Sequence, residues 1–503
     1  MSTEKTAGVP TGTPDRTALI GLLLVAFSVR AVTLLFPSIH WPDEIYQVLE
    51  HAHRWVFGYG ITSWDWQYGI RSAVPPALFT PFLWLARELG LGPGFYLPLV
   101  GAALCAWSVV VVWAAFRMAG GGNRGVVAAA PAALWGEMVL FAPHPLMDTL
   151  AAPLLVLGLL GLTREGGRAR LWTGVCFGAV FCLRPALAPA MLAATVLCVG
   201  RDARGWALLA AGGLLAIVPY GLADLAVGRP PLAAVLQYAS LGVGFVGDTL
   251  AGGAGSNPAQ PRHLLFTMLL LHWGSVLPVL VLLIAAGARG NLVWVVTALA
   301  IFLTYSLLPQ REYRYVYPAL TCLMIPMGVG LARIVETLAQ LRVMEGGAVA
   351  RLAVMVFALC SLLAARGPGM ADEWRHGSVG LEALAEVRET PKLCGLGLAP
   401  EVSVSFLGGY TVLHRNVPIY DGVEDLAGRS AYYDSILTAR PRGDLPPSYA
   451  LVSCRDGGYA DWGGSTASIC HYHRPGGCAA PDADGPAPMI RPDPVSGQDQ
   501  TGP

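Results

Sequence analysis

A hydrophilic stretch directly after the first long apolar segment decides how this chain is organised. Residues 41–76 read WPDEIYQVLEHAHRWVFGYGITSWDWQYGIRSAVPP. They hold two adjacent carboxylates, Asp43 and Glu44, together with histidines, arginines and several tryptophans. Ionisable groups beside a membrane span are costly to keep there, and they are therefore often functional. The alternative is an ordinary outer loop whose charges are solvated and whose tryptophans lie among the lipid headgroups.

The composition identifies the class of protein. The chain has 503 residues, of which 54% are hydrophobic and only 13% are charged, and its mean hydropathy is +0.53. About a quarter of the residues of a soluble globular domain are charged. The chain is therefore expected to be a polytopic membrane protein with the bilayer as its main partner. Its 33 basic residues balance 33 acidic ones, so no basic surface for nucleic acid is indicated.

Apolar segments long enough, or nearly long enough, to cross a bilayer recur along the first 366 residues. They lie at residues 17–36, 95–116, 126–142, 149–163, 171–183, 186–200, 205–226, 263–286, 291–308, 315–336 and 350–366. The pattern predicts an α-helical protein with about eleven transmembrane helices. The shorter segment 77–90 contains Pro81, Arg87 and Glu88. We expect it to be a re-entrant or interfacial helix, and the count becomes twelve if it crosses.

Arginine-rich loops set the expected orientation, because short cytoplasmic loops carry an excess of Lys and Arg. With the N-terminus inside and segment 77–90 not crossing, all these loops are cytoplasmic. Their arginines are Arg117, Arg124, Arg164, Arg168, Arg170, Arg201, Arg204, Arg289, Arg342 and Arg351. The same topology places Asp43, Glu44, Asp148 and Glu312 on the extracytoplasmic face. The first extracytoplasmic loop then spans residues 37–94.

Four regions follow from these patterns. Residues 1–16 are expected to be a disordered cytoplasmic tail, and residues 17–366 a transmembrane catalytic domain. Residues 367–480 are expected to form a small extracytoplasmic α/β or mostly β domain, with strands at 402–406 and 449–453. Residues 481–503 are rich in Pro, Gly and Asp and are expected to be disordered.

Four cysteines fall in the predicted C-terminal domain, namely Cys394, Cys454, Cys470 and Cys478. On the extracytoplasmic side they either form disulfides or remain free thiols. Closely spaced cysteine pairs are absent, which disfavours a zinc site. A glycine-rich segment at residues 228–262 shows no other pattern and is expected to be a long loop that acts as a lid or contacts the substrate.

Several polar groups in the membrane domain fall on the same predicted outer face. They are His144, Asp148, Arg184, Asp248 and the segment Gln310–Pro318. Each alone is more often a snorkelling or capping residue than a functional one. Together with residues 41–76 they supply carboxylates for proton transfer, arginines for phosphate and aromatic rings for a sugar. Because no nucleotide-binding motif is present, they favour a lipid-linked phosphosugar as the donor.

Two motifs resemble those of a known family. Trp41-Pro-Asp-Glu44 with Gln47, Glu50, Trp64-Asp-Trp66 and Gly69-Ile-Arg-Ser72 resembles the first-loop pattern of the dolichol-phosphate-mannose-dependent mannosyltransferases. These GT-C enzymes extend GPI anchors and lipid-linked N-glycan precursors. Gln310-Arg-Glu-Tyr-Arg-Tyr-Val-Tyr-Pro318 is similar to their second motif, and a looser likeness covers about residues 17–340. The departures are Trp41 in place of histidine, Gln310-Arg311 in place of His-Lys, and an aromatic Tyr-Gly-Trp-type pattern that is missing or much altered around Asp248.

The resemblance implies a GT-C architecture and roles for individual residues. Asp43 would be the general base for the acceptor hydroxyl, and Glu44 would orient Asp43 or bind the acceptor. The donor phosphate would be bound by Arg314, Arg71 and Arg184. The substrate would also be contacted by Glu312, Tyr313, Trp64, Trp66, Gln47 and Asp148. The reaction would be a single inverting displacement without a covalent intermediate.

We therefore expect a multi-pass enzyme of the cell membrane with its active site on the extracytoplasmic face. It would transfer mannose from a polyprenyl-phosphate donor to a glycan or glycolipid acceptor. No cofactor is expected to be required, and no metal ligands are assigned, although a need for a divalent metal ion stays open. One alternative is a GT-C enzyme that transfers arabinose, glucose or an amino sugar. Another is a flippase for lipid-linked sugars, but such a protein would show internal repeats and charges near the bilayer midplane.

Overall fold

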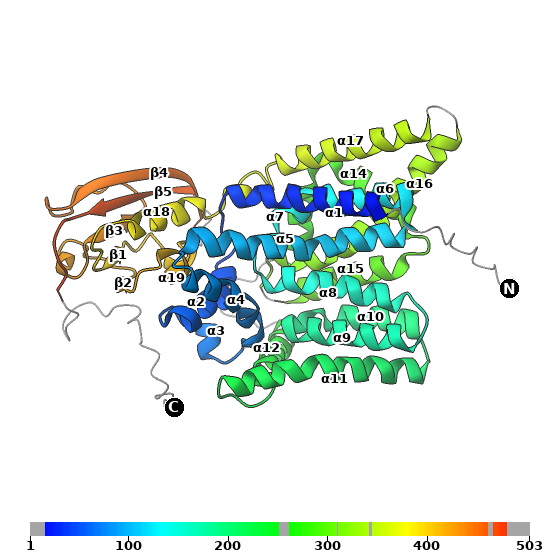
Figure 1. Cartoon of the computed structure of the whole chain (residues 1–503), viewed down its shortest axis with the longest axis horizontal. Coiled ribbons are helices and arrows are strands. Elements are labelled where there is room, and N and C mark those ends of the chain that lie inside the picture. Colours follow the sequence, from blue (N-terminus) through cyan, green and yellow to red (C-terminus); the bar gives the residue numbers. More distant parts are fainter. Residues whose placement is uncertain (1–15, 251–260, 309, 342–344, 461–465, 480–503) are drawn as a thin grey trace. The chain divides into compact units, whose positions relative to one another are not determined.

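The computed structural model describes residues 16–250, 261–308, 310–341, 345–460 and 466–479 (Figure 1). Apart from Arg16, the tails expected at residues 1–16 and 481–503 lie outside this description. The chain divides into two compact units. The first, called the helical unit here, comprises residues up to 33, 103–143 and 147–370. The second, called the mixed unit, comprises residues 34–102, 144–146 and those from 371 onward.

Helices occupy every segment that was expected to cross the membrane. They are α1 (Arg16–Ala31), α5 (Pro93–Met118), α6 (Gly122–Leu134), α7 (Gly136–Leu140), α8 (Met147–Leu162), α9 (Gly167–Leu183), α10 (Ala188–Val199), α11 (Ala203–Ala226), α13 (Leu264–Trp273), α14 (Leu277–Ala288), α15 (Leu292–Leu307), α16 (Tyr317–Gln340) and α17 (Gly346–Ala365). Among the described residues, six continuous helical stretches are long and apolar enough to cross a bilayer. The expected total of about eleven spans stays a prediction.

Helix α16 forms the core of the helical unit. Within the helical stretch Tyr313–Gln340, 89% of the most apolar 18-residue segment is buried. Helix α16 packs against α6, α8, α14, α15 and α17. Glycines permit its close approach to α14. A Cβ atom at Gly287 would lie 1.7 Å from the carbonyl oxygen of Pro326, and one at Gly330 would lie 1.9 Å from that of Leu283. Small residues at such crossings are typical of helices packed within a membrane, where backbone contact replaces hydrophobic burial.

A buried arginine stabilises the break between α6 and α7. The backbone of Trp135 is extended at this point, with ψ at 131°, so the carbonyl groups before it lose their helical partners. The guanidinium of Arg30 donates hydrogen bonds to the carbonyl oxygens of Ala132 and Ala133, at 2.6 and 2.9 Å. Arg30 is therefore a structural residue, because it satisfies backbone groups that lipid could not.

The expectation of a structureless loop at residues 228–262 is wrong. Helix α12 (Ala233–Leu250) occupies about half of that segment. Glycines such as Gly242 and Gly244 each cost about 1 kcal/mol in a soluble helix, which made the segment read as a loop. In membrane proteins glycine is common within helices, so it is a weak loop signal. The side chain of Asp248 and residues 251–260 lie outside the described part of the chain.

The mixed unit combines the first loop with the C-terminal region. The loop contributes the π-helix η2 (Glu44–Leu49) and helices α2 (Glu50–Phe57), α3 (Trp64–Gln67) and α4 (Val74–Glu88). The C-terminal region contributes helices α18 (Ser378–Arg388) and α19 (Gly409–Leu413). It also holds strands β1 (Leu396–Leu398), β2 (Ile419–Tyr420), β3 (Ser435–Thr438), β4 (Ala450–Ala460) and β5 (Thr466–His473). The C-terminal region of the chain is thus an α/β structure, while its extracytoplasmic location stays a prediction.

The strands form one sheet in the order β2-β1-β3-β5-β4. Strands β2, β1 and β3 are parallel, whereas β5 is antiparallel to both β3 and β4. Helix α18 packs against β4 and β5 (Figure 1). The core is rich in tyrosines, including Tyr420, Tyr433 and Tyr472, and their ring faces are buried together with aliphatic neighbours.

One of the two strands expected in this region is present. The segment 449–453 enters β4, as predicted. The expectation of a strand at 402–406 is wrong, because residues Val404–Phe406 form a short 3-10 helix. The side chain of Ser403 accepts a hydrogen bond from the backbone N–H of Ser405 at 3.2 Å. Serine side chains compete in this way for nearby backbone groups, and here Ser403 caps the 3-10 helix. The alternation of Val and Ser therefore did not indicate a strand.

Candidate active site

The acidic pair lies where the first loop enters a continuous helix. Asp43 is the residue before the π-helix η2, which leads directly into α2. Asp43 is half-buried, whereas Glu44 is only 3% exposed. The carboxylate of Glu44 accepts hydrogen bonds from the backbone N–H of Trp41 at 3.0 Å and from Nδ1 of His144 at 2.6 Å. Asp43 is thus the more accessible member of the pair, and Glu44 is held in the interior.

Another buried carboxylate, that of Asp65, organises the turn at α3. Asp65 is 1% exposed and accepts hydrogen bonds from Oγ of Ser63 at 2.5 Å and from the backbone N–H of Trp66 at 2.9 Å. It also forms an ion pair with Arg71, whose Nε lies 2.7 Å from its Oδ2. Arg71 therefore has a fixed carboxylate partner within the loop. Its predicted contact with the donor phosphate stays a prediction.

The two tryptophans of the motif differ in exposure. Trp66 is buried, stacks on the ring of His51 with centroids 3.9 Å apart and donates from Nε1 to the carbonyl oxygen of Gln47 at 3.3 Å. Gln47 is buried as well. Trp64 is 64% exposed. Of the two tryptophans expected to stack on a sugar, Trp64 has the exposed ring.

In the helical unit, Asp148 and Arg184 form a buried ion pair between Oδ2 of Asp148 and Nη2 of Arg184. Asp148 is in the first turn of α8, and Arg184 follows the end of α9, where Pro185 interrupts the helical path. The guanidinium of Arg184 also donates to the hydroxyl of Tyr238 at 3.2 Å. Two of the predicted site residues, 36 positions apart in the sequence, are thereby joined; that they pair with each other was not predicted.

Tyr315 connects this pair to the second motif. The guanidinium carbon of Arg184 lies 4.9 Å from the Tyr315 ring centroid, and that of Arg314 lies 5.0 Å from it. Both distances are within the range of cation–π attraction. The Nε of Arg314 also donates to Glu312 at 2.5 Å, and the other oxygen of Glu312 accepts from Gln310 at 2.5 Å. We call Asp148, Arg184, Glu312, Arg314 and Tyr315 the arginine cluster.

Three buried polar atoms at the arginine cluster have no hydrogen-bond partner within the described part of the chain. They are Nε of Arg184, Oδ1 of Asp148 and the hydroxyl of Tyr305, whose ring stacks on Tyr315. An unsatisfied buried polar group costs about 1–3 kcal/mol. The cluster therefore retains hydrogen-bonding capacity that a polar ligand or water molecules would satisfy.

Glu137 fixes the Tyr313 side chain and was not predicted from the sequence as a site residue. Glu137 is fully buried and accepts hydrogen bonds from the indole N–H groups of Trp135 at 2.6 Å and Trp273 at 3.0 Å. It also accepts from the hydroxyl of Tyr313, whose ring stacks on His272 with centroids 3.7 Å apart. The signal was available, because Glu137 is an acidic residue inside a predicted span.

The structure thus brings the predicted residues together as two groups. The acidic pair belongs to the mixed unit, and the arginine cluster belongs to the helical unit. Each group is assembled from separate segments of its own unit. That both groups serve one active site stays a prediction.

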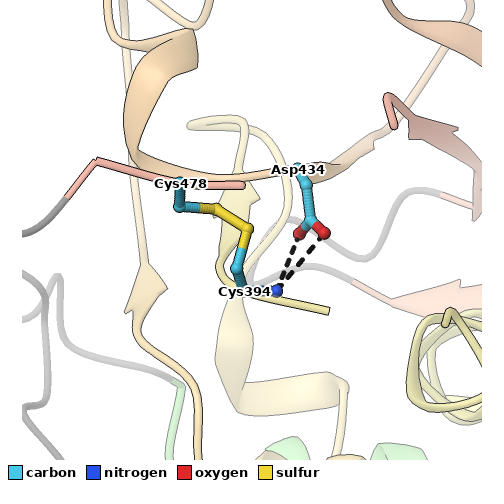
Figure 2. A group of neighbouring side chains, drawn as sticks. All are labelled: Cys394, Asp434 and Cys478. Carbon is cyan, nitrogen blue, oxygen red and sulfur yellow. Dashed lines mark hydrogen bonds between the residues drawn. A yellow bond between two sulfur atoms is a disulfide. The ribbon is translucent and has the colours of Figure 1, made fainter. Parts of the chain in front are cut away.

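One group of potential metal ligands among the described residues stabilises the fold instead of binding a metal ion. Atoms of Cys394, Cys478 and Asp434 lie within 4.8 Å of one another. Figure 2 shows that the two cysteines are joined in a disulfide, so they do not offer thiolates. The Asp434 carboxylate accepts a hydrogen bond from the backbone N–H of Cys394 at 3.2 Å and another from that of Gly395 at 3.3 Å. The four C-terminal cysteines are all paired, since Cys454 is bonded to Cys470.

The N-terminal part of the chain is similar to a known protein family. Residues 21–197 match the model of the Alg9-like mannosyltransferase family. This range contains the acidic pair, Asp148 and Arg184. The resemblance to the mannosyltransferases is confirmed.

Curated relatives match over short segments. Mannosyltransferase APTG1 of Arabidopsis thaliana is 44% identical over 80 residues, which are 16% of this chain and 14% of the relative. GPI mannosyltransferase 3 of Yarrowia lipolytica is 39% identical over 70 residues, 14% of each chain. GPI alpha-1,2-mannosyltransferase 3 of Danio rerio is 55% identical over 38 residues, 8% of this chain and 7% of the relative. The matched segments thus span about one seventh of the length of the first two relatives and 7% of the third.

The fold is shared with a solved GT-C enzyme. ArnT from Cupriavidus metallidurans, solved with bound undecaprenyl phosphate, aligns with a TM-score of 0.57 at 15% identity. The alignment covers 91% of this chain and 98% of ArnT. This likeness shows that the two proteins share a fold. The apolar helices and the mannosyltransferase relatives indicate that the chain is a multi-pass membrane protein.

Proposed function

We propose that this protein is an integral membrane mannosyltransferase that transfers mannose from a polyprenyl-phosphate carrier to a glycan or glycolipid acceptor. The observation that carries the proposal is the match to the mannosyltransferase family model, which includes the acidic pair and Arg184. The arginine cluster supports the choice of donor, because paired guanidinium groups suit a phosphate diester. A polyprenyl carrier is further supported by the undecaprenyl phosphate bound to ArnT.

The carboxylates have separate roles in the proposed reaction. The acceptor hydroxyl attacks the anomeric carbon of mannose, the bond from that carbon to the phosphate oxygen breaks, and Asp43 takes the hydroxyl proton. Asp43 is assigned this role because its side chain is more exposed than that of Glu44. Attack opposite the leaving phosphate inverts the configuration.

The arginines act on the leaving group. Breaking the bond places a second negative charge on the departing polyprenyl phosphate, and fixed cations stabilise that charge without reorganising. Arg184 and Arg314 are held by Asp148 and Glu312, which keeps them in place before the donor binds. Arg71 and Trp64 of the first loop are proposed to contact the phosphate and the sugar, respectively.

The test uses purified protein in lipid nanodiscs with radiolabelled polyprenyl-phosphate mannose and a membrane glycolipid extract as acceptor. We expect label in an acceptor product together with release of polyprenyl phosphate, and no transfer from GDP-mannose. Parallel reactions with polyprenyl-phosphate arabinose and glucose test the sugar. Transfer from GDP-mannose in the absence of any polyprenyl donor would refute the proposed donor class, and preference for another sugar would refute mannose.

A further inference from the structure

Glu50 is a buried carboxylate whose partners all lie within the mixed unit. It has 0% exposure and stands at the junction of the π-helix η2 with α2. One oxygen accepts from the backbone N–H groups of Ile61 at 2.8 Å and Tyr410 at 3.0 Å. The other accepts from the backbone N–H and the hydroxyl of Thr411, at 2.8 and 2.6 Å. Three of these four donors therefore come from α19 of the C-terminal region.

The backbone of α19 is shaped to receive this side chain. Gly409 has a positive φ of 56°, and a Cβ atom at that position would lie 2.9 Å from an oxygen of Glu50. A larger residue would therefore be strained and would also push the carboxylate away. A carboxylate that accepts four hydrogen bonds is well satisfied, so its removal would leave several buried donors without partners.

Other contacts join the same two segments. The hydroxyl of Tyr46, within η2, donates to the carbonyl oxygen of Val404 at 2.6 Å. The hydroxyl of Tyr96 donates to the carbonyl oxygen of Thr411 at 2.5 Å. His53 and His414 share a hydrogen bond between Nε2 and Nδ1 at 3.0 Å. Residues 404–414 thus hold the first loop at Tyr46, Glu50 and His53, and the first turn of α5 at Tyr96.

We propose that Glu50 is a positioning residue through which the C-terminal region holds the catalytic acidic pair in place. Asp43 and Glu50 lie at the two ends of the π-helix η2, in one continuous helical stretch. Fixing Glu50 against α19 therefore fixes the position and orientation of Asp43 within the mixed unit. The C-terminal region serves here as a structural support for the first loop. The catalytic consequence rests on the proposed function, whereas the ordering of the loop does not.

The experiment compares substitutions on both sides of this contact. Glu50→Gln keeps the shape but replaces one acceptor oxygen by a donor, and Thr411→Val removes one hydroxyl. Thr411→Ser restores that hydroxyl. Thr438→Val is the matched control, because Thr438 is equally buried and its hydroxyl donates to Arg440 within the C-terminal region, not to the loop.

Hydrogen exchange of the full-length protein is the readout that needs no substrate. We expect amides of residues 44–61 to exchange about tenfold faster in Glu50→Gln, with a smaller increase in Thr411→Val. Thr411→Ser and Thr438→Val should leave these amides unchanged. The double variant Glu50→Gln with Thr411→Val should be little worse than Glu50→Gln, since both remove one contact. Unchanged loop exchange in both single variants would overturn the proposal.

Kinetics then test the catalytic consequence. In Glu50→Gln, kcat should fall about 10- to 100-fold, the effect of a small displacement of a reacting group, while KM for the donor changes little. Thr411→Ser should recover activity. Faster loop exchange with an unchanged kcat would overturn the positioning role. If the unmodified protein transfers no mannose at all, only the proposed function fails, because the exchange data still decide whether Glu50 orders the loop.

Discussion

Nδ1 of His144 lies 2.6 Å from the carboxylate of Glu44, a residue 100 positions earlier in the chain. Both groups are buried, with 5% and 3% exposure. A close hydrogen bond of this kind fixes the rotamer of Glu44 and the backbone that carries Asp43. We expect His144→Ala to lower turnover about tenfold with little change in donor affinity. His144→Asn can still offer an N–H donor and should retain more activity; equal losses in both variants would contradict this role.

The arginine cluster predicts a different kinetic pattern. An arginine that faces phosphate is charged in the ground state and in the transition state, so Arg314→Ala and Arg184→Ala should weaken donor binding and turnover together. We expect each loss to be about 10- to 1,000-fold in kcat/KM, since a hydrogen bond to a charged group contributes about 1.5–3 kcal/mol and an unpaired buried carboxylate adds to the cost. Arg366→Ala, at an exposed position beyond the cluster, is the control. Donor titration in nanodiscs measures the affinities, and an unchanged donor Kd in both variants would exclude these residues as phosphate ligands.

Much of this cluster could be predicted from the sequence, because charged residues within apolar segments are rare and conspicuous. Asp148 and Arg184 were identified in this way, and Glu312 and Arg314 from the polar motif that follows a span. Arg184 and Arg314 contact Tyr315, and Asp148 and Glu312 each pair with one of these arginines. Glu137 was missed although it is equally anomalous. Its hydrogen bonds with Trp135, Trp273 and Tyr313 depend on tertiary packing between segments that no local pattern relates.

The fold was predictable to a similar degree. Hydrophobic length located the helices, because a bilayer demands long apolar segments. The glycine content of α12 led to the wrong prediction of a loop, and the alternation of Val and Ser at 402–406 led to the wrong prediction of a strand. Both signals depend on the surroundings of the backbone, which the local sequence does not give. The support that α19 gives to the first loop could not be foreseen. It rests on contacts between residues more than 350 positions apart, such as Glu50 and Thr411 at a separation of 361.

The histidine pair of the mixed unit predicts a dependence of stability on pH. Burial, with a smaller effect from His414, lowers the pKa of His53 to about 3, and the backbone hydrogen bond with Tyr59 opposes this only partly. The unfolded chain, with a histidine pKa of about 6.5, therefore binds more protons than the folded one below that pH. The contribution of neutral His53 to the free energy of unfolding is complete above about pH 6.5. It is lost as the pH falls from there towards 3, by about 1.4 kcal/mol per pH unit.

This pH effect can be measured by hydrogen exchange of residues 50–61 and 404–414 between pH 7.5 and pH 5, after correction for intrinsic exchange rates. We expect progressive loss of protection in the unmodified protein. His53→Gln, which does not titrate, should show a weaker dependence. If protection fell equally with pH in both proteins, His53 would not govern the pH dependence.

The arginine-rich loops predict the topology. In a background that keeps the two disulfides, Arg168→Cys should resist a membrane-impermeant thiol reagent in intact cells, while Gln67→Cys should react. Gln67 is suitable because its side chain is exposed next to the motif tryptophans. Both variants should react after permeabilisation, which controls for accessibility. The reverse labelling would place the first loop, and the proposed active site with it, in the cytoplasm.

The turnover of Asp43→Asn is the most direct test of the central claim that Asp43 is the general base. Asparagine keeps the volume and one acceptor oxygen but cannot take a proton at neutral pH, so turnover should fall about 10²- to 10⁴-fold. Donor affinity should change little, because that is assigned to the arginines. Glu44→Gln should be milder, since it disturbs a positioning contact. Near-normal turnover of Asp43→Asn with loss of activity in Glu44→Gln would mean that the roles are reversed, and activity in both would contradict a catalytic first loop.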